Sequence, residues 1–210
     1  MQEIEFQLPL LKLRGLSNGK TNLPVILCLH GWLDNAASFL PLNGYLEHYH
    51  VIAIDLPGHG LSDHKSQDAY YHFIDWVSDI YSLFEDQGWG SIHIVGHSMG
   101  AMIASAFAAA FPEKVTSLVL IDSIGFITLP IYETAQQLRA GVISRDTLQH
   151  KKRRYLKNEY AAVIARQRVG DLSFDDAQIL VKRNLLDTDD GLIWRYDHKL
   201  QLTSPYRLSK

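Results

Sequence analysis

Residues 91–111, SIHIVGHSMGAMIASAFAAAF, contain a short apolar run, a turn with two glycines and an alanine-rich segment. The pentapeptide GHSMG at residues 96–100 fits G-x-S-x-G, a pattern in which two glycines let a strand turn sharply into a helix and hold the central serine in a strained conformation. Apolar residues then recur at helical spacing until Pro112 ends the helix. The stretch predicts a strand, a bend at Ser98 and a helix packed closely on a sheet.

The predicted bend places a hydroxyl beside the start of a helix. Free backbone N–H groups at a helix N-terminus stabilise negative charge. Ser98 is therefore the candidate nucleophile, and the amide of Met99 is a candidate donor to an oxyanion. The alternative interpretation is a structural strand–turn–helix unit in which the serine is incidental.

The composition is that of one globular domain with a large core: 210 residues, 47% of them hydrophobic, and a net charge of −3. Charges of both signs are interspersed. The basic cluster at residues 151–154, KKRR, lies in a segment typical of an amphipathic helix, where a solvated face is the simpler interpretation. We therefore expect no nucleic-acid partner.

A single cysteine, Cys28, excludes an intrachain disulfide and favours a reducing compartment. It lies in an apolar run, where a free cysteine usually behaves as a small buried hydrophobe, so we do not assign it as a nucleophile. No apolar stretch approaches the ~18 residues that span a bilayer. The sequence therefore predicts a cytoplasmic protein with no membrane partner.

Four apolar runs have the character of buried parallel strands: residues 25–29, 51–54, 92–95 and 115–121. An antiparallel hairpin over residues 3–16 precedes them, and a helical stripe covers residues 70–87. Strands that alternate with helices predict an α/β fold with a doubly wound, mostly parallel sheet. Four polar residues follow the strands and should gather at one edge of the sheet: His30, Asp55, Ser98 and Asp122.

The pattern changes after the last of these strands. Helices are expected at residues 129–140, 146–166 and 174–184, with a break at Gly141 and no strand. The DTDDG segment at residues 187–191 lacks the spacing of a calcium loop and is interpreted as a loop between helices. We expect a core at 1–128, an all-helical cap at 129–200, and a return towards the core at 201–210.

Three motifs together resemble a known family: HGWLD at 30–34, DLPGHGLS at 55–62, and the GHSMG turn. The chain is similar to the α/β-hydrolase fold, within the serine hydrolase-like and epoxide hydrolase/haloperoxidase-like branch that carries a helical cap. The resemblance implies Ser98 as nucleophile and an oxyanion hole from the backbone amides of Trp32 and Met99. Serine, instead of aspartate, at the elbow favours ester-type acyl transfer, and no metal or organic cofactor is implied.

Further residues of these motifs are candidate pocket residues. His30, Gly31 and His97 are expected to line the pocket, although His30 and His59 could instead brace loops through hydrogen bonds. His97 is also an alternative base, but adjacent residues at an elbow point in different directions. Asp55 is expected to order its own loop.

The chain departs from the family order of nucleophile, acid and histidine. Only His150 and His198 follow Ser98, and we expect both to be solvated or to make structural contacts. Asp122 is either the acid or a residue that hydrogen-bonds loop amides. The expectation is therefore that the fold is truncated at its C-terminus, with the remaining triad residues beyond residue 210.

Two functional hypotheses follow. The first is a serine hydrolase that acts on small carboxylic esters or related acyl compounds; the second is a catalytically inactive, truncated chain that lacks the triad histidine. Without a histidine the serine stays a weak nucleophile. An unpaired apolar strand at Val115–Ile121 also predicts self-association through that edge.

Overall fold

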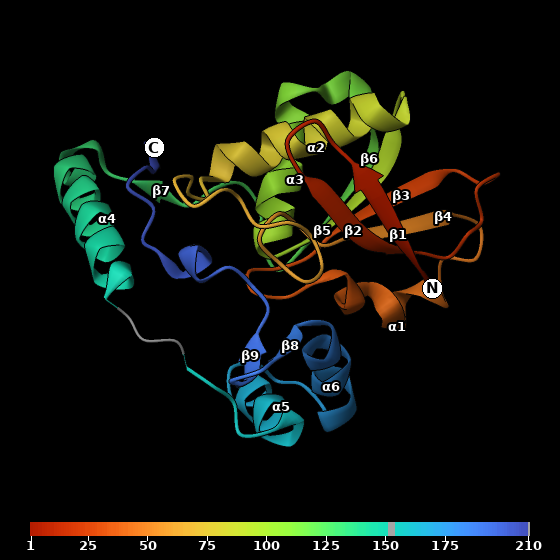
Figure 1. The fold of residues 1–210 in the computed structure, drawn as a ribbon. Helices are drawn as coiled ribbons and strands as arrows, with labels where there is room; N and C mark the ends of the chain where they lie inside the picture. Colours follow the sequence, from red (N-terminus) through yellow and green to blue (C-terminus); the bar gives the residue numbers. More distant parts are fainter. Residues whose placement is uncertain (151–153, 210) are drawn as a thin grey trace.

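The computed structural model describes residues 1–150 and 154–209, and a six-stranded sheet forms its centre (Figure 1). The strand order is β1-β2-β4-β3-β5-β6. The strands are β1 (Gln2–Gln7), β2 (Lys12–Ser17), β3 (Val25–Leu29), β4 (His50–Ile54), β5 (Ile92–His97) and β6 (Val115–Ile121). β1, β2 and β4 pair antiparallel, whereas β4, β3, β5 and β6 are parallel neighbours. The predicted hairpin and the mostly parallel sheet are confirmed.

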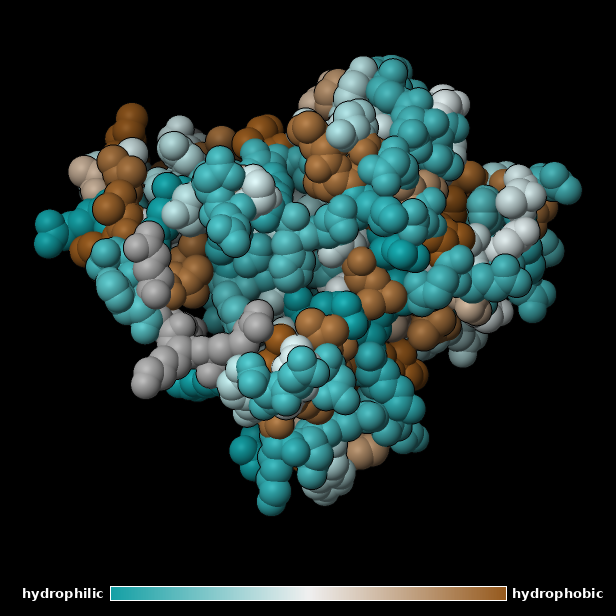
Figure 2. Space-filling view, viewed as in Figure 1, coloured by the Kyte–Doolittle hydropathy of each residue, from teal (hydrophilic) through white to brown (hydrophobic). Residues whose placement is uncertain are grey.

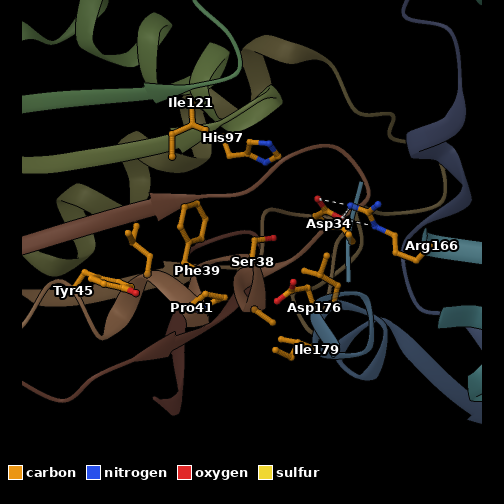
Figure 3. Close-up of a pocket in the computed structure, with 14 residues that line it drawn as sticks. Asp34, Ser38, Phe39, Pro41, Tyr45, His97, Ile121, Arg166, Asp176 and Ile179 are labelled. Atoms are coloured by element: carbon orange, nitrogen blue, oxygen red, sulfur yellow. Dashed lines mark hydrogen bonds and ion pairs between the residues drawn. The ribbon is translucent and has the colours of Figure 1, made fainter. Parts of the chain in front are cut away.

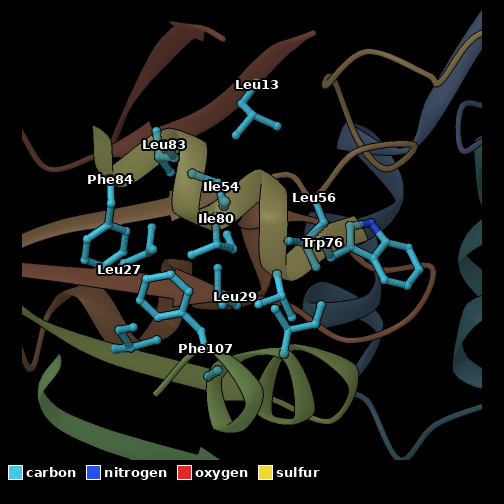
Figure 4. Close-up of a cluster of buried hydrophobic side chains, with 14 of the residues drawn as sticks. Leu13, Leu27, Leu29, Ile54, Leu56, Trp76, Ile80, Leu83, Phe84 and Phe107 are labelled. Carbon is cyan, nitrogen blue, oxygen red and sulfur yellow. The ribbon is translucent and has the colours of Figure 1, made fainter. Parts of the chain in front are cut away.

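Alternate residues of β3 face two separate hydrophobic cores. Leu27 and Leu29 pack in the core under α2 (Phe73–Gln87) and α3 (Met99–Ala110), shown in Figure 4. Ile26 and Cys28 pack on the other face, against η1 (Ala36–Phe39). Because both faces of the strand are covered, the run is apolar at nearly every position. The predicted burial of Cys28 is confirmed.

Helix α2 begins at Phe73, three residues later than the apolar pattern suggests. His72 and Asp75 form a capping box, in which the Asp75 carboxylate accepts the amide of His72 at 3.2 Å. The helix ends where Gly88 adopts a left-handed conformation, as expected for a glycine C-cap.

The segment after the sheet is not entirely helical, so the prediction of an all-helical cap is wrong. It contains α4 (Thr134–Gln149), α5 (Glu159–Gln167) and α6 (Phe174–Arg183), followed by an antiparallel hairpin of β8 (Leu185–Thr188) and β9 (Gly191–Trp194). The DTDDG segment therefore forms the end of β8, the turn at residues 189–190 and the start of β9, not a loop between helices. Strands of four residues are too short for their periodicity to be distinguished from that of a helix.

Helix α4 continues through Gly141, where a break was expected. A side chain at this position would lie 2.7 Å from Cβ of Pro205, so the glycine permits close packing and does not end the helix. The expected helix at 146–166 is in fact the end of α4 and all of α5, which begins after the N-cap Asn158. Residues 151–153 of the basic cluster lie outside the described part of the chain.

Short elements complete the chain: α1 (Leu40–Asn43), η2 (Pro112–Lys114), η3 (Ile131–Glu133) and η4 (His198–Gln201). A two-residue strand, β7 (Thr128–Leu129), pairs in parallel with β10 (Leu208–Ser209). Figure 2 shows apolar side chains on the surface over α4. On this helix Leu138, Val142 and Ile143 are exposed. Among the described residues, no helix has the length and apolar character needed to cross a membrane.

Candidate functional site

Ser98 occupies the bend between β5 and α3 in the strained conformation that its motif predicts. Its φ is 48° and its ψ is −114°, and its amide donates to the carbonyl of Ile121 on β6 at 2.8 Å. A Cβ on Gly96 would lie 2.5 Å from the carbonyl oxygen of Gly100. The bend therefore depends on residues without side chains on both sides of the serine.

Gly31 brings the loop after β3 against the bend. A side chain on Gly31 would lie 3.0 Å from Nδ1 of His97 and 3.5 Å from Cβ of Ser98. The glycine thus lets the neighbouring backbone approach the serine closely. Gly31 and Ser98 are 67 residues apart in the sequence, so two separate motifs meet at this point.

Two backbone amides near Ser98 are the expected oxyanion donors. In residues 1–150 and 154–209, neither the Trp32 amide nor the Met99 amide donates a hydrogen bond. The Trp32 side chain is anchored separately, because its indole nitrogen donates to the carbonyl of Leu200 at 3.1 Å. Because neither N–H group is already paired, both amides stay candidate donors to an oxyanion.

His30 is fully buried beneath this loop and is not among the residues that line the pocket described below. Its Nε2 accepts the amide of Leu56 at 2.9 Å, so the proton of the neutral ring is on Nδ1, which donates to the carbonyl of Gly31 at 2.7 Å. Burial lowers the pKa of His30 to about 4. The imidazole therefore braces two loops as a neutral group.

His59 is equally buried and packs edge-on against His30, with the ring centroids 4.9 Å apart. Its Nδ1 lies 3.2 Å from the carbonyl of Pro57, and burial lowers its pKa to about 3. Both rings are uncharged at neutral pH, so they act as structural groups within the core.

Asp55 accepts four hydrogen bonds although it has no exposed surface. Two come from the backbone amides of Ala36 and Leu61, at 2.7 and 2.9 Å. The other two come from Nε of Arg183 on α6, at 3.0 and 2.9 Å. Asp55 therefore orders its own loop, as expected, and also binds the helices that follow the sheet.

Three further side-chain contacts join the loop after β3 to the helical segment. Asn35 donates to the carbonyl of Leu180 at 2.9 Å, and Asn184 donates to the carbonyl of Leu33 at 3.1 Å. Arg166 pairs with Asp34 through its Nη2 at 2.9 Å. The loop that carries the expected oxyanion donor is thus held from both sides, by the sheet and by α5 and α6.

Within the described part of the chain, the remaining candidates make no hydrogen bond to the serine hydroxyl. Asp122 is exposed, has a φ of 63°, and makes no hydrogen bond or ion pair within residues 1–150 and 154–209. His150 caps the end of α4, and His198 lies in η4 with its ring 5.9 Å from that of Tyr196. The described residues contain no group of three His, Cys, Asp or Glu side chains placed to hold a metal ion.

A pocket of about 470 Å³ opens beside the bend, between the loop after β3 and the helix α6 (Figure 3). Two residues beside Ser98 form part of its wall: His97, which precedes the serine in the sequence, and Ile121, whose carbonyl accepts the serine amide. Its other walls come from 3₁₀ and helical residues 37–45 and from residues 166–180. His97 therefore lines this pocket, whereas Gly31 and Ser98 are not among its lining residues.

Sequence analysis missed the residues that join the two parts of the site. Arg166 and Arg183 each pair with a carboxylate more than 100 residues away, at separations of 132 and 128. The sequence carried one indication, because both arginines fall on or beside the apolar stripe of a predicted helix, where a charged side chain needs a partner.

The comparisons with known proteins agree with this geometry. A family model described as the alpha/beta hydrolase fold matches residues 24–190. Over 206 residues, 94% of its length, the chain is 34% identical to a serine hydrolase-like protein of Danio rerio. It spans 63% of that relative, which is less than two-thirds.

Solved structures are similar along nearly the whole chain. A hypothetical protein of Pseudomonas aeruginosa PAO1 superposes with a TM-score of 0.95 and 34% identity, covering 100% of this chain and 75% of the other. A thioesterase domain from the curacin biosynthetic pathway superposes with a TM-score of 0.83 and 25% identity, covering 97% of this chain and 72% of the other.

Proposed function

The chain belongs to the α/β-hydrolase fold family, and from that premise we propose that it is a serine hydrolase which cleaves small carboxylic esters or related acyl compounds through a Ser98 acyl-enzyme. One observation carries the proposal: Ser98, at a φ of 48°, lies against Gly31 and beside an apolar pocket. A thioesterase among its structural neighbours supports the acyl class.

In the proposed reaction the Ser98 hydroxyl oxygen attacks the carbonyl carbon of the substrate. The backbone amides of Met99 and Trp32 donate to the oxyanion that forms, and loss of one such donor typically costs about 100- to 1000-fold in rate. During the attack the serine proton passes to a base, which then gives it to the alcohol or thiol as the C–O or C–S bond breaks. Water next attacks the acyl-enzyme, its proton returns to the serine oxygen through the base, and the carboxylic acid leaves.

A second candidate function is a chain that binds acyl compounds without turning them over. Its support is that, within the described residues, the Ser98 hydroxyl accepts and donates no hydrogen bond, and Asp122 has no partner. His97 stays the alternative base, because its ring and Ser98 both lie against Gly31. A serine that no base activates is a weak nucleophile.

Covalent labelling tests the nucleophile. The protein is treated with an alkyl fluorophosphonate and digested, and the adduct is located by tandem mass spectrometry, with Ser98→Ala as the control. We expect the adduct on Ser98. An adduct on another serine while Ser98 stays unmodified would refute the assignment.

Turnover separates the two candidates. A rate of p-nitrophenyl acetate hydrolysis well above that of Ser98→Ala supports the hydrolase, whereas equal rates support the binding-only chain. If turnover is observed, its loss in His97→Gln would identify the base.

We also propose a reducing compartment, the cytoplasm, as the place of action. The support is the single cysteine, Cys28, which is fully buried and whose pKa is raised by burial to about 12. A thiol of that kind is kept reduced and unreactive. Fractionation of the native cells, followed by immunodetection, tests the assignment.

A further inference from the structure

We propose that the pocket beside Ser98 binds the acyl part of the substrate and selects a neutral, apolar chain of about six to ten carbon atoms over an acidic one. This inference rests on the proposed function, because it takes Ser98 as the point at which the acyl group is held. It adds a substrate class, which the family and the comparisons leave open.

The walls of the pocket are largely apolar and come from two parts of the chain. The loop and helices after β3 contribute one wall, and α6 contributes the other together with Leu172, two residues before it. The apolar lining residues are Ala37, Phe39, Pro41, Leu42, Ile121, Leu172, Ile179 and Leu180. Figure 3 shows Phe39 and Pro41 opposite Ile179. An alkyl chain between these walls would leave water. The polar lining residues are Asp34, Ser38, Tyr45, His97, Arg166 and Asp176, and among the described residues the buried Ser38 hydroxyl has no hydrogen-bond partner.

The volume of the pocket sets the length of the chain. An apolar cavity of about 150 Å³ holds one benzene molecule, which has six carbons. The present pocket, at about 470 Å³, is roughly three times as large and is open to solvent on one side. A chain of about six to ten carbons fits within its walls and leaves the rest of the volume to the ester group and to solvent at the open side.

Charge at one end of the pocket excludes an acidic chain. Arg166 would favour a carboxylate, but its Nε and Nη2 donate to Asp34 at 3.2 and 2.9 Å (Figure 3). Asp34 is only 8% exposed and cannot leave this pair for solvent. A substrate carboxylate would therefore lie against Asp34, and like charges so close repel. A neutral chain meets no such cost.

Binding to the Ser98→Ala variant tests the proposal without turnover. Isothermal titration calorimetry compares methyl octanoate, methyl acetate and monomethyl succinate. We expect methyl octanoate to bind at least about tenfold more tightly than either of the other two, since each buried methylene adds to affinity. Equal affinity for methyl octanoate and methyl acetate, tighter binding of monomethyl succinate, or no binding of any ester overturns the proposal.

Substitutions locate the chain in this pocket. In the Ser98→Ala background, Ile179→Trp fills one wall and Leu42→Trp fills the facing wall; each should weaken methyl octanoate binding about tenfold or more. Ile74→Trp is the matched control, because Ile74 is 67% exposed on α2 and does not line the pocket. If both wall variants bind methyl octanoate as the control does, the chain lies elsewhere.

A charge variant tests the selection against acids. Asp34→Asn preserves the shape of the side chain and removes the negative charge that neutralises Arg166 and repels an acid, so the affinity for monomethyl succinate should rise about tenfold. Adding Arg166→Gln should remove that gain, whereas methyl octanoate binding should change little. No gain in Asp34→Asn would contradict the role of the pair.

Ester binding and fluorophosphonate labelling together distinguish a failure of the acyl specificity from a failure of the proposed function. Fluorophosphonate labelling reports on the Ser98 hydroxyl, which the binding variants lack. Labelling at Ser98 with no preference for methyl octanoate refutes only the acyl specificity. Selective binding of methyl octanoate without labelling refutes the nucleophile and supports the binding-only chain.

Discussion

Arg183 binds Asp55 across 128 residues of sequence, with its Nε at 3.0 and 2.9 Å from the two carboxylate oxygens. The side chain of Asp55 is fully buried, and that of Arg183 is 7% exposed. A buried ion pair is weak evidence for stability in itself, but removal of one partner leaves the other charge without compensation. This contact therefore holds α6, and with it one wall of the pocket, against the loop after β4.

Replacement of Arg183 by methionine should lower the free energy of unfolding by about 3–5 kcal/mol, because the Asp55 carboxylate stays buried without its cation. Urea unfolding followed by tryptophan fluorescence measures the loss. Glu3→Gln is the control: Glu3 also pairs with Arg183, but its side chain is 51% exposed and should contribute only about 0–1 kcal/mol. Equal losses in the two variants would contradict this assignment.

Alanine at Gly100 should destabilise the protein by about 3 kcal/mol or more, because its Cβ would overlap the backbone carbonyl of Leu29. Thermal unfolding measures the effect. Gly44→Ala serves as the control, since Gly44 has a φ of −65° and a side chain there would meet nothing within 4 Å. That variant should change stability by less than about 1 kcal/mol. A mild effect at Gly100 would mean that the bend tolerates a side chain.

The two buried histidines predict a loss of stability in acid. The pKa values of His30 and His59 are about 4 and about 3 in the folded protein, below the usual 6.5, because burial disfavours the charged rings. Between pH 6.5 and 4 the unfolded chain therefore binds more protons, and the free energy of unfolding falls as pH falls. Each histidine should contribute up to about 1.4 kcal/mol per pH unit. Below about pH 6 Asp79 offsets part of this slope, because burial raises its pKa to about 6 and the folded state then binds more protons at that group.

Urea titrations between pH 7.5 and 4.5 measure this slope, at about one-unit steps. His59→Asn should remove the contribution of His59 to this slope. Substitution of the exposed His48 by glutamine should leave the slope unchanged. A slope that is the same in His59→Asn as in the unmodified protein would show that His59 does not titrate as proposed.

The edge strand β6 predicts self-association. Within the described sheet β6 pairs only with β5, and the side chains of Val119 and Ile121 are 51% and 42% exposed. An exposed, apolar strand edge without lysine or proline favours pairing with a second chain. We expect dimers or larger species in size-exclusion chromatography with light scattering, and a shift towards monomer in Val119→Lys. Ile74→Lys, on α2, is the control; a monomer at every concentration would refute the prediction.

The sequence by itself determined the sheet and the bend at Ser98. The bounds of β3 and β6 agree with the predicted strands at 25–29 and 115–121, because continuous apolar runs between polar turns are a local signal. The glycines at 96 and 100 are equally local, since the sharp turn needs both within five residues. That Gly31 lies near the serine was predicted only from the resemblance to the family, not from the local pattern.

The tertiary structure alone decided how the site is closed. Leu42 and Ile179 face one pocket, and Arg166 neutralises Asp34, but no periodicity links residues that far apart in the chain. The same holds for His30. Its position before Gly31 is compatible with a ring that lines the pocket or with a buried ring, and only the hydrogen bond from the Leu56 amide in the folded chain shows that the ring is buried. The β8–β9 hairpin was missed for a related reason: four-residue strands are specified by their mutual pairing more than by their own pattern. Apolar periodicity tells which face of an element is buried, whereas the identity of the partner depends on packing between elements that meet only in the folded chain.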